Sequence, residues 1–137
     1  MSEQNKAIVS RYMEEVFNKK NLAALDELVG SNCVIHSPDG DVHGLEGLKQ
    51  IVSTYQTVFP DHQFTVEEMI AEEDKIAARW TMRGTQRGEL RGIPPTGKRV
   101  TLMGMSIFRV AGGKIVEDWV SPDTLGLLQQ LGVAPKI

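Results

Sequence analysis

The sequence predicts an α+β fold in which helices come first and a mainly antiparallel sheet follows. Apolar residues recur at helical spacing in the first part of the chain, whereas from Gln63 onward they alternate with other residues. Residues 100–110 are apolar on both alternating faces, which is typical of a strand that is covered on both sides. Helices followed by strands favour segregated α and β layers over a βαβ arrangement.

The composition indicates one folded unit with no affinity for polyanions. A chain of 137 residues is the size of one domain, and we expect a single domain over residues 1–137. The net charge of −3 and the scattered basic residues argue against nucleic acid as a partner. No apolar run could span a membrane, and the polar N-terminus does not resemble a secretory signal. Cys33 is the only cysteine, so we expect no internal disulfide and a cytoplasmic location.

The first part of the chain predicts three helices. Residues 3–19 form the first, and a second, short helix starts after Asn21 and ends at Gly30. Residues 32–36 follow as a short strand, and the next residues are turn formers. The third helix starts near Gly44 and ends before Pro60. His62, which follows that proline, is expected in a surface loop.

The second part of the chain predicts strands joined by turns. A strand beginning at Gln63 turns at residues 72–74 and returns over residues 75–83. Residues 84–97 contain four glycines and two prolines, which favours an irregular excursion. Residues 100–110 and 114–121 then form a hairpin around the corner at 111–113, and Asp123 caps a closing helix.

One face of the 100–110 strand predicts a homo-oligomer. Met103, Met105 and Ile107 share that face, and leaving them in water would expose a larger apolar patch than monomers usually tolerate. We therefore expect a homodimer or a higher homo-oligomer formed through the sheet.

Several short motifs together carry a family resemblance. They are Gly84-Thr85, Gly92-Ile93-Pro94-Pro95-Thr96-Gly97, Phe108-Arg109, Gly113-Lys114-Ile115, Pro122-Asp123 and Gln130-Leu131-Gly132. On these motifs the chain resembles the SnoaL-like polyketide cyclases, of the predicted ester cyclase type, within the nuclear transport factor 2-like fold. The resemblance implies a cone in which a curved sheet wraps around the N-terminal helices and leaves an apolar pocket open at one end. It also implies oligomers joined through the sheet, and chemistry without a cofactor or a metal.

The catalytic pattern of that family is not kept in this chain. In the cyclases that it resembles, an aspartate just before the Pro-Asp corner works with a histidine on the preceding strand. The aspartate removes a proton from a carbon between carbonyl groups, and an intramolecular aldol reaction closes a ring. The corresponding positions here are Val120 and Ser106, which cannot act in those roles.

The remaining candidate for a base is Asp118, and its orientation depends on the strand register. A three-residue loop would pair Ser106 with Asp118 and turn both to the same side, whereas a two-residue loop would pair Ser106 with Trp119. In the second register Glu117 would be the carboxylate in the pocket. Because the two catalytic positions of the family share a pocket, the resemblance favours the first register.

The expected pocket combines these strand residues with aromatic residues of the core. Its predicted lining residues are His36, Tyr12, Tyr55, Trp80, Ser106, Phe108, Trp119 and Val120. His36 is included because the family often has a polar residue at the pocket mouth there. Residues 36–43 also hold two histidines and two aspartates, but they form a turn without rigid ligand spacing, so we expect no metal.

Two classes of function follow from these observations. The first is a cofactor-free acid-base enzyme that acts on a small apolar carbonyl compound as a cyclase, isomerase, dehydratase or hydrolase. The alternative is a protein that binds an apolar small molecule without catalysis, because the catalytic aspartate and histidine positions are Val120 and Ser106. A pocket carboxylate with a raised pKa and a nearby polar group would distinguish the two. A scaffold with a filled cone is a third interpretation.

Overall fold

The computed structural model describes residues 2–134. Its elements, in chain order, are α1 (Ser2–Arg11), the π-helix η1 (Tyr12–Asn18), the 3-10 helix η2 (Leu22–Ala24), α2 (Leu25–Leu28), β1 (Val29–Ser37), β2 (Gly40–His43), α3 (Gly44–Val58), β3 (Gln63–Glu72), β4 (Lys75–Thr85), β5 (Arg99–Ala111), β6 (Lys114–Pro122) and α4 (Thr124–Gln130). Within the described residues no helix is long and apolar enough to cross a membrane.

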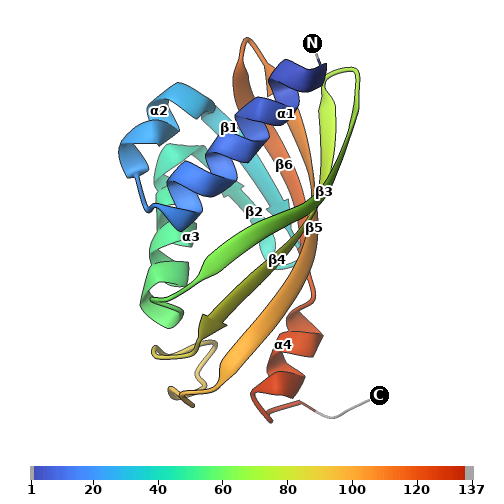
Figure 1. Cartoon of the computed structure of the whole chain (residues 1–137). Helices are drawn as coiled ribbons and strands as arrows, with labels where there is room; N and C mark the ends of the chain where they lie inside the picture. Colours follow the sequence, from blue (N-terminus) through green and yellow to red (C-terminus); the bar gives the residue numbers. More distant parts are fainter. Residues whose placement is uncertain (1, 135–137) are drawn as a thin grey trace.

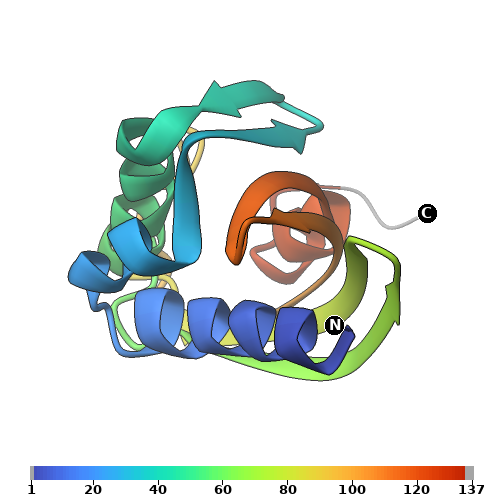
Figure 2. The same ribbon diagram turned by 90° about the horizontal axis from the view of Figure 1, so that it is seen from above.

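The strands form one curved sheet that does not close on itself. The strand order is β2-β1-β6-β5-β4-β3, and neighbours pair antiparallel except β1 and β6, which are parallel. Figures 1 and 2 show α1 and α3 on the concave side of this sheet, and α4 beside β5 at the end opposite the N-terminus. The α+β fold predicted from the sequence, with a mainly antiparallel sheet around N-terminal helices, is confirmed.

The strand β5 separates the inside of the molecule from the outside. Its residues alternate strictly between buried and exposed from Arg99 to Phe108. The buried set packs against the helices, while Met103, Met105 and Ile107 are exposed on the convex face in the single chain. The predicted partner for this face remains an expectation.

The N-terminal region differs from the sequence prediction in three places. The expected first helix is α-helical only to Arg11 and continues as the π-helix η1. Gly30 does not end a helix, because it already lies in β1, where an added Cβ atom would come within 3.2 Å of the Val116 side chain. The turn residues after Ser37 form a hairpin whose second arm is β2, which was not predicted.

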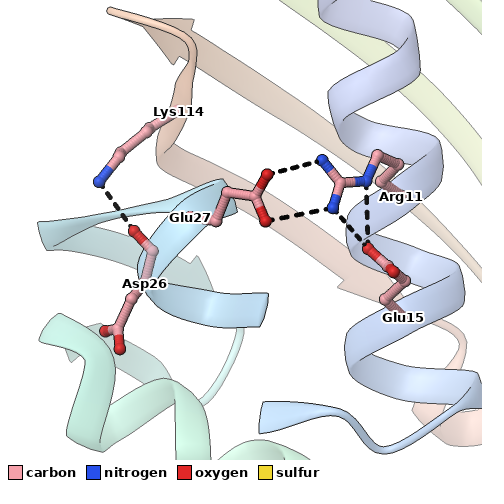
Figure 3. A network of polar contacts seen from close by, with 5 residues as sticks. All are labelled: Arg11, Glu15, Asp26, Glu27 and Lys114. Atoms are coloured by element: carbon pink, nitrogen blue, oxygen red, sulfur yellow. Dashed lines mark hydrogen bonds and ion pairs between the residues drawn. The ribbon is translucent and has the colours of Figure 1, made fainter. Parts of the chain in front are cut away.

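Polar contacts hold the N-terminal helices to each other and to the β5–β6 turn. The Arg11 guanidinium binds Glu15 at 2.9 Å and Glu27 at 3.1 Å, and thereby joins α1 and η1 to α2. The Lys114 ammonium group donates to the carbonyl oxygen of Asp26 at 2.8 Å (Figure 3). These exposed contacts fix geometry more than they stabilise the fold.

His62 is buried, contrary to the predicted surface position. It is 1% exposed, and its ring nitrogens lie 2.9 Å from the Phe59 carbonyl oxygen and 2.7 Å from that of Phe17. These backbone contacts compensate the polar ring for the loss of water. His62 therefore joins the end of α3 to η1.

Candidate active site

The pairing of β5 with β6 decides which carboxylate faces the inside. The hairpin has a two-residue turn, Gly112-Gly113, but Val116 is an extra residue in β6, where the register shifts. As a result Ser106 pairs with Val120, and both predicted pairings of Ser106 are wrong. The bulge restores the parity that the short turn would have lost, so Asp118 points inward although the loop has two residues.

A cavity of about 350 Å³ lies inside the cone and is lined mostly by apolar side chains. Seven of the residues singled out from the sequence line it, namely Tyr12, Tyr55, Trp80, Ser106, Phe108, Asp118 and Val120. The π-helix η1 contributes Tyr12, Met13 and Phe17 to the wall, and π-helical turns often occur at functional sites.

Asp118 is the buried carboxylate of this cavity. It is 9% exposed, and its Oδ1 atom has no hydrogen-bond partner among residues 2–134. Burial raises the pKa of Asp118 to about 7, while a hydrogen bond with Ser106 and the more distant charge of His36 oppose this rise. The carboxyl group can therefore both accept and donate a proton near neutral pH.

Ser106 connects Asp118 to an indole. The Trp80 Nε1 atom donates a hydrogen bond to the Ser106 Oγ atom at 3.1 Å. The indole lies across Gly104 of the neighbouring strand, where a Cβ atom would overlap the ring. Since the hydroxyl accepts from Trp80, its own proton is directed to Asp118 or to a bound molecule.

Two phenols in the cavity keep their protons. Burial raises the pKa of Tyr55 to about 12, and burial together with the charge of Asp118 raises the pKa of Tyr12 well above its ordinary value. Both line the cavity as neutral groups that can donate a hydrogen bond.

His36 and Trp119 do not line the cavity, which corrects their predicted place in its wall. They are neighbours across the parallel β1–β6 pair, and their rings stack at 5.3 Å on the convex face of the sheet. His36 binds Asp41 at 2.9 Å and Glu117 at 2.7 Å, and these carboxylates raise its pKa. The physical reason is the alternation along β1 and β6, since their neighbours Ile35 and Asp118 take the inward positions.

The excursion between β4 and β5 is built around one buried amide that the sequence analysis did not single out. The side chain of Gln86 is fully buried and donates to the carbonyl oxygens of Gly88, Ile93 and Pro94 at 3.1 to 3.3 Å. Its Oε1 atom accepts from both the backbone and the hydroxyl group of Thr96. These contacts hold the excursion in one shape against the end of α3, where Gly88 lies against Thr57.

Arg91 and Asp39 lie where the cavity opens to solvent. Both line the cavity, and the Arg91 Nη2 atom is 2.6 Å from the Asp39 Oδ2 atom. The pair joins the β1–β2 turn to the excursion, and both side chains are largely exposed. The cavity thus has a buried carboxyl group at depth and an ion pair at its mouth.

The sequence and the fold of this chain match those of known proteins. A family model described as SnoaL-like polyketide cyclase matches residues 7–131. This chain belongs to the SnoaL-like polyketide cyclase family. Resemblance from short motifs is therefore confirmed over nearly the whole chain.

Relatives within the family include named cyclases. The chain is 30% identical over 112 residues to aklanonic acid methyl ester cyclase DauD from Streptomyces sp. (strain C5), and the match covers 79% of this chain and 66% of that protein. It is 28% identical over 127 residues to nogalonic acid methyl ester cyclase from Streptomyces nogalater, covering 88% of this chain and 92% of that protein.

Solved structures show the same fold with differing assignments. AclR from Streptomyces galilaeus, provisionally assigned as a hydroxylase, has a TM-score of 0.88 at 30% identity and covers 100% of this chain and 90% of its own. IdmH from Streptomyces antibioticus, provisionally assigned as a polyketide cyclase, has a TM-score of 0.83 at 34% identity, covering 95% and 99%. Members of one fold thus differ in assigned chemistry, so the function must be argued from the site.

Proposed function

We propose that this protein is a cofactor-free acid-base enzyme that cyclises a small apolar carbonyl compound, with Asp118 as the base. The observation that carries the proposal is a buried carboxyl group in an apolar cavity, with a pKa of about 7 and one oxygen that has no hydrogen-bond partner among residues 2–134. A base with a pKa near the working pH combines a useful ionised fraction with sufficient basicity. The family relationship supports a reaction of the cyclase type.

The chemistry needs one proton acceptor and one hydrogen-bond donor. Ionised Asp118 removes a proton from a carbon next to a carbonyl group, and the resulting enolate carbon attacks a second carbonyl of the same molecule. The new carbon–carbon bond leaves an alkoxide, which takes the proton back from Asp118, so the product is an isomer of the substrate. The neutral phenols of Tyr12 and Tyr55 and the hydroxyl group of Ser106 are the donors available to the enolate oxygen.

A second candidate is a protein that binds an apolar molecule without acting on it. The observation that favours it is the pair Ser106 and Val120, which face each other in the cavity at the positions where the family's cyclases have histidine and aspartate. In this case Asp118 would only complement a polar group of the ligand. Proton transfer from carbon separates the two candidates.

The test uses deuterium exchange at the carbons next to the carbonyl group of 2-tetralone, followed by proton NMR in D₂O at neutral pH. We expect the wild-type protein to accelerate exchange and Asp118→Asn to lower this acceleration at least about 100-fold. Asp74→Asn is the matched control, because Asp74 pairs with Lys75 outside the cavity. Binding of 2-tetralone without acceleration by the wild type would favour the binding protein, and equal rates for wild type and Asp118→Asn would remove Asp118 as the base.

A further inference from the structure

The mouth of the cavity carries a cation whose position is fixed by the fold. Arg91 is the only lysine or arginine among the described residues that line the cavity. It stands at the tip of a two-residue turn in which Leu90 and Ile93 exchange backbone hydrogen bonds of 3.0 and 2.7 Å. Both residues of the tip, Arg91 and Gly92, have positive φ values of 50° and 80°, as the tightest hairpin turns require.

The excursion behind this tip is rigid enough to present Arg91 in one place. The bonds from Gln86 to the carbonyl oxygens of Ile93 and Pro94 anchor the returning arm of the turn. Leu90 and Ile93 also pack against the hydrophobic core. The guanidinium is therefore carried by a supported loop, which lowers the entropy cost of a contact with a ligand.

The ion pair with Asp39 leaves donors of Arg91 unused. Asp39 is contacted through Nη2 at 2.6 Å and through Nη1 at 3.5 Å. A guanidinium carries five N–H donors, so a second acceptor can bind beside Asp39. At the same time Asp39 offsets the charge of Arg91 and competes with any anion that approaches the mouth.

We propose that Arg91 determines substrate specificity by binding a carboxylate group on the solvent-facing end of an otherwise apolar substrate. The apolar body fills the cavity and brings the carbonyl chemistry to Asp118, while the carboxylate stays at the mouth on the guanidinium. In the free protein Asp39 pairs with Arg91 and competes with the substrate carboxylate for it. The assignment of the inner end rests on the proposed function, whereas binding at the mouth can be measured without turnover.

The test compares an acid with its neutral ester in the same cavity. The probes are 2-naphthylacetate and methyl 2-naphthylacetate, and their dissociation constants are measured by calorimetry at pH 6, where Asp118 is mainly protonated. We expect Arg91→Gln to weaken the carboxylate about fivefold to tenfold and the ester less than about twofold, because only the acid loses a charge-assisted hydrogen bond. Arg87→Gln is the matched control, since Arg87 is exposed in the same excursion and does not line the cavity.

Asp39→Asn separates ligand recognition from a purely structural role. It removes the competing carboxylate, so Asp39→Asn should bind 2-naphthylacetate more tightly than the wild type does. Its affinity for the ester should equal that of the wild type. If the ion pair only closes the mouth, Arg91→Gln and Asp39→Asn would instead change the affinity for both probes in the same direction. That result would overturn the proposal. The proposal would also fail if Arg91→Gln weakened the binding of the acid and the ester equally, or if the wild-type protein did not bind the acid. If the wild-type protein bound the acid through Arg91 but did not accelerate deuterium exchange, the proposed role of Asp118 would fail and that of Arg91 would stand.

Discussion

Replacing Asp118 with asparagine should stabilise the protein at alkaline pH while it removes the proposed base. The pKa of this carboxyl group rises from 3.8 to about 7 on folding because of burial, which at about 1.4 kcal/mol per unit corresponds to roughly 4 kcal/mol. The folded state favours the protonated carboxyl group, so its ionisation lowers the free energy of unfolding. This penalty is absent at pH values below the pKa of the unfolded chain. The penalty grows as the pH rises between the two values and is complete above the folded pKa.

Asparagine cannot ionise and therefore escapes this penalty, although its amide must find partners in the same apolar site. At pH 4.5 we expect the urea midpoint of Asp118→Asn to equal that of the wild type or to lie slightly below it. At pH 8.5 the free energy of unfolding of the variant should exceed that of the wild type by about 2 to 4 kcal/mol. Urea unfolding of both proteins at several pH values gives the comparison. A difference between them that does not change with pH would show that the carboxyl group is not desolvated, and the argument for a tuned base would fail.

Three further expectations concern the rest of the molecule. The pKa of His36, measured by NMR titration, should lie above 6.5 and should fall in Glu117→Gln, because Glu117 favours the charged ring. The contact between the charged ring and Glu117 stabilises the fold at acid pH, and this stabilisation is lost as the pH rises through the pKa of His36 in the folded protein. An unchanged His36 pKa in Glu117→Gln would contradict the contact. Gln86→Ala should cost about 2 to 3 kcal/mol in urea unfolding and speed amide exchange in the excursion. It removes the hydrogen bonds that a fully buried amide makes to the excursion and leaves an unfilled space there. A change below about 0.5 kcal/mol would refute this. Light scattering should show a homodimer that becomes a monomer in Met105→Lys, because Met105 is 58% exposed on the convex face; a wild-type monomer at micromolar concentration would disprove it.

The sequence predicted the fold because its apolar periods and its family motifs agree over nearly the whole chain. The β5 strand is a clear case, since its alternation separates buried from exposed residues as expected. The π-helical continuation from Tyr12 was not predictable, because the spacing of apolar residues over one turn hardly differs between α- and π-helices. Hairpin β1–β2 was missed for another reason, since its turn residues suit a loop equally well.

The candidate site was predictable in composition but not in register. Asp118 was singled out as the remaining carboxylate near Ser106 and Val120, yet its inward direction depends on the bulge at Val116. Bulges follow from local packing and leave little trace in the sequence. The alternation along β1 also turns His36 outward, because its neighbour Ile35 takes the inward position beside Asp118. The family resemblance had instead placed His36 in the pocket wall.

The excursion shows the limit of reading residues singly. Glycines and prolines in residues 84–97 indicated an irregular segment, and nothing in that pattern marks Gln86 as its buried centre. A glutamine is usually exposed, and its place between Gly84 near the end of β4 and Gly88 in the excursion does not mark it as buried. The position of Arg91 at the cavity mouth follows from that centre and could not be inferred before it.

The most direct test of a tuned base in an apolar cavity is the titration of Asp118 itself. Aspartate labelled with carbon-13 at the side-chain carboxyl group, with Asp118→Asn to assign the signal, allows its pKa to be read by NMR. The structure leads us to expect a midpoint near 7, because burial disfavours the carboxylate and one of its oxygens lacks a hydrogen bond within the described chain. A midpoint near the ordinary value of 3.8 would mean that water reaches the carboxylate, and would contradict the account of the site.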